Sequence, residues 1–452
     1  MLQEVLARFE KHAPVSVMAR VALERAIEPG WVDEVFEAHR QRQYSRELLF
    51  STVVELMSLV SLGLRPSLHA AARRAELPVS LAALYDKIRR TEPAILRALV
   101  RGSAERLAPV VEAMASPPSL PGWRLRVLDG NHLAASEKRL APLRGWRGAA
   151  LPGHTLVVYD PDTTLVTDLV ACEDAHAQER SAVAPLLACA RAGELWIADR
   201  NFCTRSLLQG WHDAEASFIV REHAKHPRLL DKAEWTDCGR IETGSVREQA
   251  ICVREGQTPW RRIELRLDTP TESGETTIRL WSNLPREVCA ATIAALYRKR
   301  WRIEGMFQRL ESVLESEIRS LGHPRAALLG FAVAVLAYNV LAVLKRSVEH
   351  AHRDRQPQLD VSTYYLALLI RSGYEGMLVA LPAPTWQPWS EAEPAVIAQR
   401  LLELAQHIDP RRVRTNKRGP KMDKPKGYVD KALARAHVST ARVLKQAMAN
   451  RP

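Results

Sequence analysis

A change of hydrophobic period after residue 116 constrains the fold of this chain more than any other feature. Pro117-Pro118 and Pro121-Gly122 end a helical pattern. Apolar segments with strand character follow at residues 124–129, 154–159, 165–171, 194–199 and 217–220. Helical segments at residues 178–192 and 204–213 separate the later strands. The order of three strands, helix, strand, helix and strand predicts a mixed sheet whose first three strands form a meander.

The segments around this core have patterns of their own. Residues 1–116 are helical, and residues 221–287 alternate apolar and polar residues as strands do. Residues 288–346 return to helix, with helix expected over 289–320, and complete the core. Residues 347–452 form a helical C-terminal region that includes a basic arm. We therefore expect an α/β fold with a ribonuclease-H-like core (117–220 and 288–346), a β-rich insertion and all-α terminal regions.

Two of the predicted strands end in an acid, and a third acid follows the insertion. Asp129 and Asp199 each close an apolar strand, and Glu304 lies on the helix after residue 288. One Asp at a strand end is usually a turn residue, but strand ends also meet at the sheet edge where sites form. Three carboxylates at one edge repel each other unless cations compensate them. Two Mg²⁺ (or Mn²⁺) ions would do so, and ions about 4 Å apart suit in-line phosphoryl transfer.

The helix carrying Glu304 presents a polar face. Tyr297, Arg300 and Glu304 fall at helical spacing on that face, while Ile303 and Met306 can pack on the other. An Arg fork fits a phosphate, and a carboxylate can hold a metal. The alternative is a solvated charged helix with i,i+4 pairs.

Two short helices in the N-terminal region resemble a helix-turn-helix. They are expected at residues 67–75 and 80–90. A helical bundle that only packs is the alternative. The side chains that would contact phosphates are Arg73, Arg74, Lys87, Arg89 and Arg90.

The charge balance favours a polyanionic partner. The net charge is +12, and residues 411–426 hold eight Lys or Arg against one Asp. This arm, which includes Arg411, Arg412, Lys417 and Arg418, would neutralise DNA phosphates. A solvated linker before a last helix at 431–448 is the alternative.

The remaining features are those of a cytoplasmic, nucleoid-associated protein. The six Cys form no CxxC pair, which favours reduced thiols, and the N-terminus lacks the layout of a signal peptide. Residues 326–344 contain no charge and are long enough to span a bilayer. Their Ala content, Gly330 and Asn339 favour a buried core helix instead.

Three blocks of the sequence resemble the Asp-Asp-Glu insertion-sequence transposases, specifically the "IS-four" group. They are Leu128-Asp129-Gly130-Asn131-His132, Ile197-Ala198-Asp199-Arg200-Asn201-Phe202, and Tyr297-x2-Arg300-x3-Glu304. The resemblance covers about residues 120–345. It implies that Asp129, Asp199 and Glu304 are catalytic metal ligands, and that Tyr297 and Arg300 contact the DNA end. We group Arg200, in the second block, with the DNA-binding residues.

The resemblance also implies cut-and-paste transposition of double-stranded DNA, acting on inverted-repeat ends and target DNA. Because joining needs both ends in one assembly, we expect a homodimer on DNA, and we expect no membrane partner. A hairpin intermediate would be supported by a Trp of the insertion, for which Trp235, Trp260 and Trp281 are the candidates. The chain departs from the group at Glu311, where the pattern has Lys; Arg309 or Arg319 could supply that contact instead.

Two other functions remain open on this evidence. The first is a catalytically impaired DNA-binding relative that inhibits transposition, and Glu311 is the feature that favours it. The second is a nuclease that cuts DNA without strand transfer.

Overall fold

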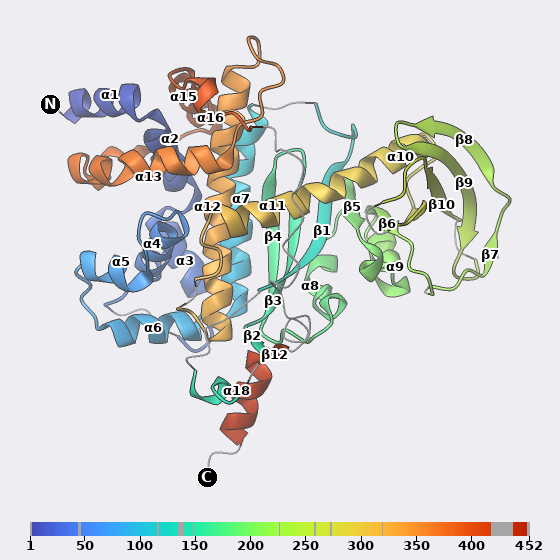
Figure 1. Cartoon of the computed structure of the whole chain (residues 1–452), viewed down its shortest axis with the longest axis horizontal. Helices are drawn as coiled ribbons and strands as arrows, with labels where there is room; N and C mark the ends of the chain where they lie inside the picture. Colours follow the sequence, from blue (N-terminus) through green and yellow to red (C-terminus); the bar gives the residue numbers. More distant parts are fainter. Residues whose placement is uncertain are drawn as a thin grey trace, which may run out of the picture.

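The sheet runs through the whole right-hand part of the molecule (Figure 1). The protein is represented by a computed structural model. It describes residues 2–43, 47–114, 117–133, 140–146, 148–225, 227–256, 259–271, 274–318, 320–416 and 437–449. Ten strands form one sheet in the order β4-β3-β1-β5-β6-β11-β10-β9-β7, with β8 paired to β9.

The first half of the sheet has the predicted core topology. Strand β1 pairs antiparallel with β3, which pairs antiparallel with β4, whereas β5 and β6 run parallel to β1. This arrangement confirms the ribonuclease-H-like core. The strands are β1 (Arg124–His132), β3 (His154–Asp160), β4 (Leu165–Cys172), β5 (Glu194–Ala198) and β6 (Ser217–Arg221).

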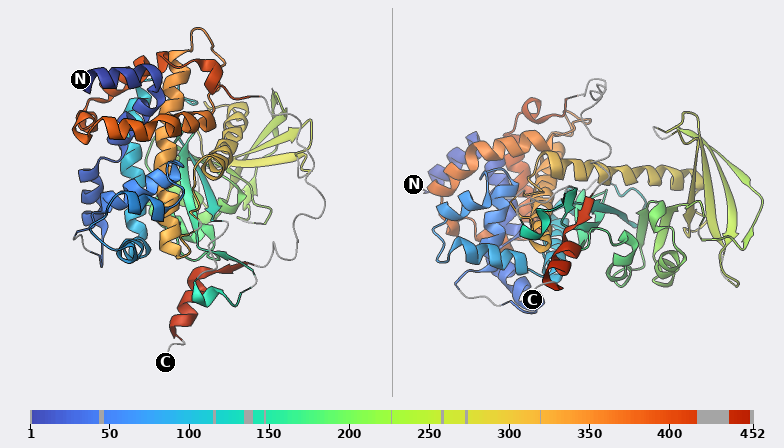
Figure 2. Two further views of the ribbon diagram at one scale, coloured as in Figure 1. Left: turned by 60° about the vertical axis from the view of Figure 1, so that its left-hand side comes forward. Right: turned by 60° about the horizontal axis from the view of Figure 1, so that its bottom comes forward.

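The insertion extends the same sheet instead of forming a separate one. Strand β11 pairs antiparallel with β6, so the insertion strands continue outward from the core. Helix α10 and the helix after it bridge the helical body and this insertion (Figure 2). The insertion strands are β7 (Asp231–Lys232), β8 (Thr236–Ile241), β9 (Gly244–Cys252), β10 (Trp260–Leu267) and β11 (Thr277–Ser282).

The apolar run at residues 326–344 lies in helix α12 (Pro324–Ala351), at the centre of the molecule. Helix α12 contacts α2, α4, α6, α7, α13, α15 and strand β4. It is long and apolar enough to cross a membrane, but 94% of its most apolar window is buried inside the protein. The helix is therefore a core element, as its composition predicts. The N-terminal helices are α1 (Leu2–His12), α2 (Pro14–Ala26), α3 (Pro29–His39), α4 (Phe50–Ser61), α5 (Leu68–Arg74), α6 (Leu81–Arg90) and α7 (Pro93–Glu112).

The C-terminal helices pack back onto the N-terminal ones. Helices α13, α14 and α15 all contact α2, so these helices and the N-terminal ones share one helical body. Segments α14 and α16 are single turns. The C-terminal helices are α13 (Thr363–Ala380), α14 (Pro388–Glu391), α15 (Pro394–Gln406), α16 (Pro410–Val413) and α18 (Thr440–Ala449). Strand β12 (His437–Ser439) pairs with β2 (Ala149–Leu151), and α18 follows it. The predicted final helix begins later than expected, and residues 431–436 lie outside the described chain.

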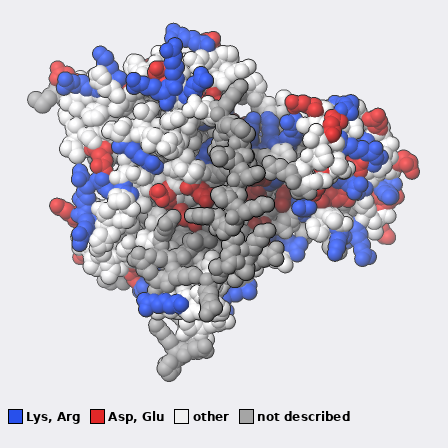
Figure 3. All heavy atoms as spheres, in the orientation of Figure 1, with Lys and Arg blue, Asp and Glu red and all other residues white. Residues whose placement is uncertain are grey.

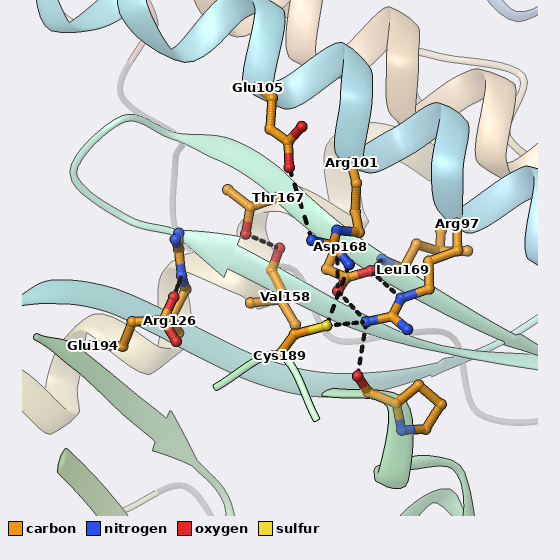
Figure 4. Close-up of polar contacts among 11 residues, drawn as sticks. Arg97, Arg101, Glu105, Arg126, Val158, Thr167, Asp168, Leu169, Cys189 and Glu194 are labelled. Atoms are coloured by element: carbon orange, nitrogen blue, oxygen red, sulfur yellow. Dashed lines mark hydrogen bonds and ion pairs between the residues drawn. The ribbon is translucent and has the colours of Figure 1, made fainter. Parts of the chain in front are cut away.

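A partly buried ion pair joins the helical body to the sheet (Figure 4). Arg97, on α7, donates hydrogen bonds of 2.8 and 2.7 Å to the two carboxylate oxygens of Asp168 on β4. Arg97 Nη2 and Arg101 Nη1 also approach the Cys189 sulfur, at 3.5 and 3.3 Å. Because α7 and β4 are far apart in the sequence, this contact fixes how the helices sit on the sheet.

Three local predictions are wrong. The helix predicted at 178–192 is instead a 3-10 turn, η2 (Glu179–Ala182), and one turn of α-helix, α8 (Ala184–Leu187); Pro185 interrupts the backbone bonding that a longer helix needs. Strand β1 continues past Asp129 to His132, because residues 129–132 pair with β3. The helix predicted over 289–320 is divided into α10 (Ala290–Tyr297), a 3-10 segment η4 (Arg298–Arg300) and α11 (Trp301–Ser312).

Candidate active site

Asp129 lies on β1, and Asp199 directly follows the end of β5, the neighbouring parallel strand. Leu128 and Ala198, the residues before the two acids, pair with each other. Neighbouring strands lie about 4.8 Å apart, so the two acids leave this last paired position close together. The Asp199 side chain also accepts a 2.8 Å hydrogen bond from the Asn201 backbone N–H, which caps the short segment η3 (Arg200–Phe202).

Side-chain alternation decides which face of the sheet the two acids share. Val127 and Ile197, two positions earlier on each strand, belong to the large core beneath the helices. Because alternate residues of a strand point to the same face, Asp129 and Asp199 point toward the helical side. Helix α11, which carries Glu304, contacts β1.

One guanidinium joins the first and third acids. Arg300 Nη1 donates a 2.9 Å hydrogen bond to Asp129 Oδ2, and its Nη2 donates a 2.7 Å hydrogen bond to Glu304 Oε1. The Arg300 side chain is 14% exposed, whereas that of Glu304 is 54% exposed. Arg300 is thus held inside the site, and Glu304 lies at its mouth.

Burial of Asp129 destabilises its ionised form. Burial raises the pKa of Asp129 to about 6; Arg300 opposes this shift, and the nearby charges of Asp199 and Glu179 add to it. The Asp129 side chain is 19% exposed. A site with this excess of carboxylate charge is electrostatically suited to a cation.

Tyr297 lies behind the same acids. It is buried, and burial raises its pKa to about 12 although Arg300 and Arg221 lower it. The negative charge of Asp199 also raises the pKa of Tyr297. The structure therefore places Tyr297, Arg300, Asp129 and Asp199 around one point.

The donor set suits Mg²⁺ in its chemistry. Carboxylate oxygens are the ligands that this ion uses in proteins. Among the described residues, however, no group of three or more His, Cys, Asp or Glu is arranged to hold a metal ion as the structure stands. The Arg300 guanidinium lies between Asp129 and Glu304, so a divalent ion could join these two carboxylates once that cation moves away.

A fourth acid, Glu179, which was not selected from the sequence, lies beside the ends of β1 and β5. Glu179 Oε2 accepts a 2.6 Å hydrogen bond from Asn201 Nδ2, and its Oε1 lies 3.9 Å from His132 Nδ1. A Cβ on Gly130 would come within 2.0 Å of Glu179 Oε1. Glu179 therefore bridges the ends of β1 and β5 where Gly130 leaves room for it. The Asp-Gly step after the first acid was the available signal.

The other predicted DNA-binding residues are scattered over the molecule. Arg200 is exposed beside Asp199 and lies 3.6 Å from Glu275, and Arg411 and Arg412 are exposed on α16. Lys417 and Arg418 lie outside the described residues, as does Arg319. Lys and Arg side chains occur on both the helical body and the insertion (Figure 3). Overall charge therefore does not locate a DNA path.

The predicted helix pair of the N-terminal region is present, but some of its cations are already engaged. Lys87 Nζ donates a 2.7 Å hydrogen bond to the Leu48 carbonyl oxygen and lies 4.6 Å from the centre of the Phe36 ring. Arg89 and Arg90 both pair with Asp86. Lys87 thus has a packing role, which favours the bundle interpretation for this residue.

The three candidate tryptophans differ in how deeply their side chains are buried. Trp260 and Trp281 are each 1% exposed and belong to a core cluster. Trp235 is half-buried, with the Arg247 guanidinium 4.3 Å from its ring centre. Of the three, Trp235 is the one that is not buried.

Comparison with known proteins relates this chain to transposases. Residues 124–340 match the family described as "Transposase DDE domain". Two Escherichia coli proteins, the transposase for insertion sequence element IS421 and transposase InsL of IS186A (strain K12), are each 27% identical over 247 residues. Each alignment covers 46% of this chain and 62% of the relative, so the chain spans about three-fifths of the length of these curated relatives.

A cryo-EM structure of a piggyBac transposase synaptic complex with hairpin DNA aligns over 83% of this chain and 86% of that chain. The identity is 9% and the TM-score is 0.39. The family match covers the strands and helices that carry Asp129, Asp199 and Glu304. Residues 124–340 of this chain are therefore similar to the family described as "Transposase DDE domain", and the curated relatives that the chain resembles are named as transposases of insertion-sequence elements.

Proposed function

We propose that the chain is a DNA transposase that nicks the ends of an insertion sequence and joins them to target DNA by phosphoryl transfer. The observation that carries this proposal is the shared guanidinium: Arg300 binds Asp129 and Glu304 at once, beside Asp199. Such a convergence of acids from β1, β5 and α11 suits a cation-assisted reaction on a phosphodiester. The transposase DDE domain match supports the same reaction class.

Asp129, Asp199 and Glu304 would hold two Mg²⁺ or Mn²⁺ ions. When bound, such ions activate the attacking oxygen and stabilise the leaving oxygen of an in-line displacement. Arg300, which now binds Asp129 and Glu304, has a planar fork that would fit the oxygens of the scissile phosphate when these carboxylates hold ions. The buried Tyr297 phenol would orient this guanidinium.

The proposed partners are double-stranded DNA bearing transposon inverted repeats and target DNA. Joining requires both ends in one assembly, so the active species would be a homodimer on DNA. We assign the chain to the "IS-four" group on its Tyr297-x2-Arg300-x3-Glu304 block. A hairpin intermediate would place an unpaired base near Trp235, since aromatic rings stack on such bases.

The proposal is tested by nicking of end DNA in Mg²⁺. Asp129→Asn and Glu304→Gln should lower the nicking rate by at least a thousandfold while the affinity for end DNA changes by less than about threefold. Glu287→Gln, which removes an exposed carboxylate just before α10, is the matched control and should nick at the wild-type rate. Wild-type nicking by either site variant would refute the assignment of these acids.

A non-catalytic relative that binds DNA remains the second candidate, and Glu311 favours it. This exposed acid on α11 stands where the resembled pattern has Lys. The same assay separates the functions. A wild-type protein that binds ends without nicking them would be the inhibitor, and one that nicks but never joins them would be a nuclease.

A further inference from the structure

Two cavities adjoin each other immediately beyond Asp199. One has a volume of 530 Å³ and the other 540 Å³, and Arg200 and His223 line both. The first lies between η2, η3 and the start of helix α9 (Arg205–Asp213), and the second reaches the insertion strands. We call the two together the arginine cleft.

The arginine cleft is strongly cationic. Within the described residues that line it, seven arginines face two glutamates, an excess of five positive charges. The lining of the first cavity, as described, contains no Asp or Glu. The seven arginines are Arg180, Arg200, Arg205, Arg221, Arg228, Arg262 and Arg279.

The glutamates of the cleft are already engaged. Glu222 accepts hydrogen bonds of 3.0 and 2.7 Å from Arg262. Glu275 lies 2.5 Å from Arg221 and 3.6 Å from Arg200. Arg205 and Arg228 are exposed, and in the part of the chain that is described neither has an acidic partner. Their charges are therefore available to an anion from outside.

A buried acid holds one side of the cleft in place. Glu264 is 1% exposed and accepts hydrogen bonds from Arg279 at 2.8 Å, Arg266 at 3.0 Å and Arg247 at 2.7 Å. Burial raises the pKa of Glu264, but these three hydrogen bonds outweigh it and lower the pKa overall. An ionised Glu264 thus fixes the direction of the Arg279 guanidinium before any ligand arrives.

We propose that the arginine cleft binds the phosphates of an unpaired DNA strand that continues from the candidate active site. This inference rests on the proposed function. Arginine forks match phosphate oxygens, and the like charges gathered here need a polyanion to compensate them. The cleft leads to Arg262, whose guanidinium lies 5.5 Å from the Trp235 ring centre. A basic groove that ends at an aromatic ring is the arrangement that holds single strands.

The experiment compares two double variants that each remove two positive charges. Arg205→Ala/Arg228→Ala alters the cleft, whereas Arg353→Ala/Arg355→Ala removes exposed charges that line neither cavity. Affinity is measured from 50 to 200 mM salt on two probes, a blunt duplex end and the same end with a single-stranded extension. Each lost phosphate contact on a single strand reduces the magnitude of the slope of log K against log salt by about 0.7. Because the cleft variant loses two arginines, its slope on the extended probe should be smaller than that of the wild type by about 1 to 1.5. The control should keep the wild-type slope.

The two probes and a conservative variant decide the outcome. An equal loss on the blunt duplex would mean that the cleft contacts paired DNA and would overturn the unpaired-strand assignment. An unchanged slope on both probes would overturn the cleft itself. Arg205→Lys/Arg228→Lys keeps both charges and should restore most of the slope, which excludes misfolding as the cause. Wild-type nicking in Mg²⁺ is scored separately, so its absence would count against the proposed function and not against the cleft.

Discussion

Asp129 and Glu304, on different elements of the core, bind opposite ends of the Arg300 guanidinium. The two hydrogen bonds measure 2.9 and 2.7 Å. A single positive charge therefore holds together two carboxylates that would otherwise repel each other, with Asp199 beside them. The same contact keeps Arg300 ordered, so a guanidinium suited to a phosphate is already inside the site.

The raised pKa of Asp129 predicts a stability effect that depends on pH. An acid whose pKa is higher in the folded chain favours folding below its unfolded value, and this contribution is lost as the pH rises through about 6. Without metal, Asp129→Asn should therefore be more stable than the wild type at pH 7.5, by about 2 to 3 kcal/mol, and similar to it near pH 4. Thermal unfolding at both pH values measures this, with Asp354→Asn at an exposed position as the control. Equal stabilisation at both pH values would contradict the electrostatic cause.

Gly130 and Glu179 should be coupled in stability. A Cβ at residue 130 would displace the Glu179 carboxylate and break its hydrogen bond with Asn201, so Gly130→Ala should cost about 1 kcal/mol. In a chain that already carries Glu179→Ala, the same substitution should cost almost nothing. Denaturant unfolding of the four proteins of this cycle gives the coupling energy. If the two single effects simply add, Glu179 does not occupy the space above Gly130.

The Arg97–Asp168 pair should contribute far more to stability than an exposed pair does. Arg97→Ala leaves a nearly buried carboxylate without its two hydrogen bonds, and should lower the free energy of unfolding by about 3 kcal/mol. Arg124→Ala removes a pair with Glu112 in which both side chains are about half exposed, and should cost less than 1 kcal/mol. Urea titration of both variants tests the difference. Similar midpoints would show that the contact does not hold α7 on the sheet.

Glu311→Lys should strengthen DNA binding. Residue 311 is exposed on α11, seven residues after Glu304 on the same helix, so the substitution replaces a repulsive charge with an attractive one without disturbing the core. If DNA passes this helix, the slope of log K against log salt should become steeper by about 1. Asp213→Lys, at the exposed end of α9, makes the same charge change and serves as the comparison. An equal gain in both variants would indicate a general charge effect and not a local contact.

The sequence alone was sufficient for the chain order of the core strands, the meander of the first three, the β-rich character of residues 221–287 and the position of Asp199 at the end of an apolar strand. The elements follow from the local hydrophobic period of the sequence. The acids follow from their place directly after apolar residues, as in Leu128-Asp129 and Ala198-Asp199, because neighbouring parallel strands end at the same edge of a sheet. The apolar composition of residues 326–344 likewise predicted a buried helix, which is α12.

The tertiary structure decided which side chains meet. Glu179 lies on a short turn that sequence periodicity presented as a longer helix, and its position over Gly130 follows from how that turn packs on β1. Helical spacing did not predict the 3-10 segment before α11. It therefore did not predict the hydrogen bond from Arg300, in this segment, to Asp129. The arginine cleft gathers residues from five segments between 180 and 279, because long-range pairing brings β6 and β11 beside the end of β5. Local preference sets each element, whereas contacts between distant elements are fixed by packing of the whole chain.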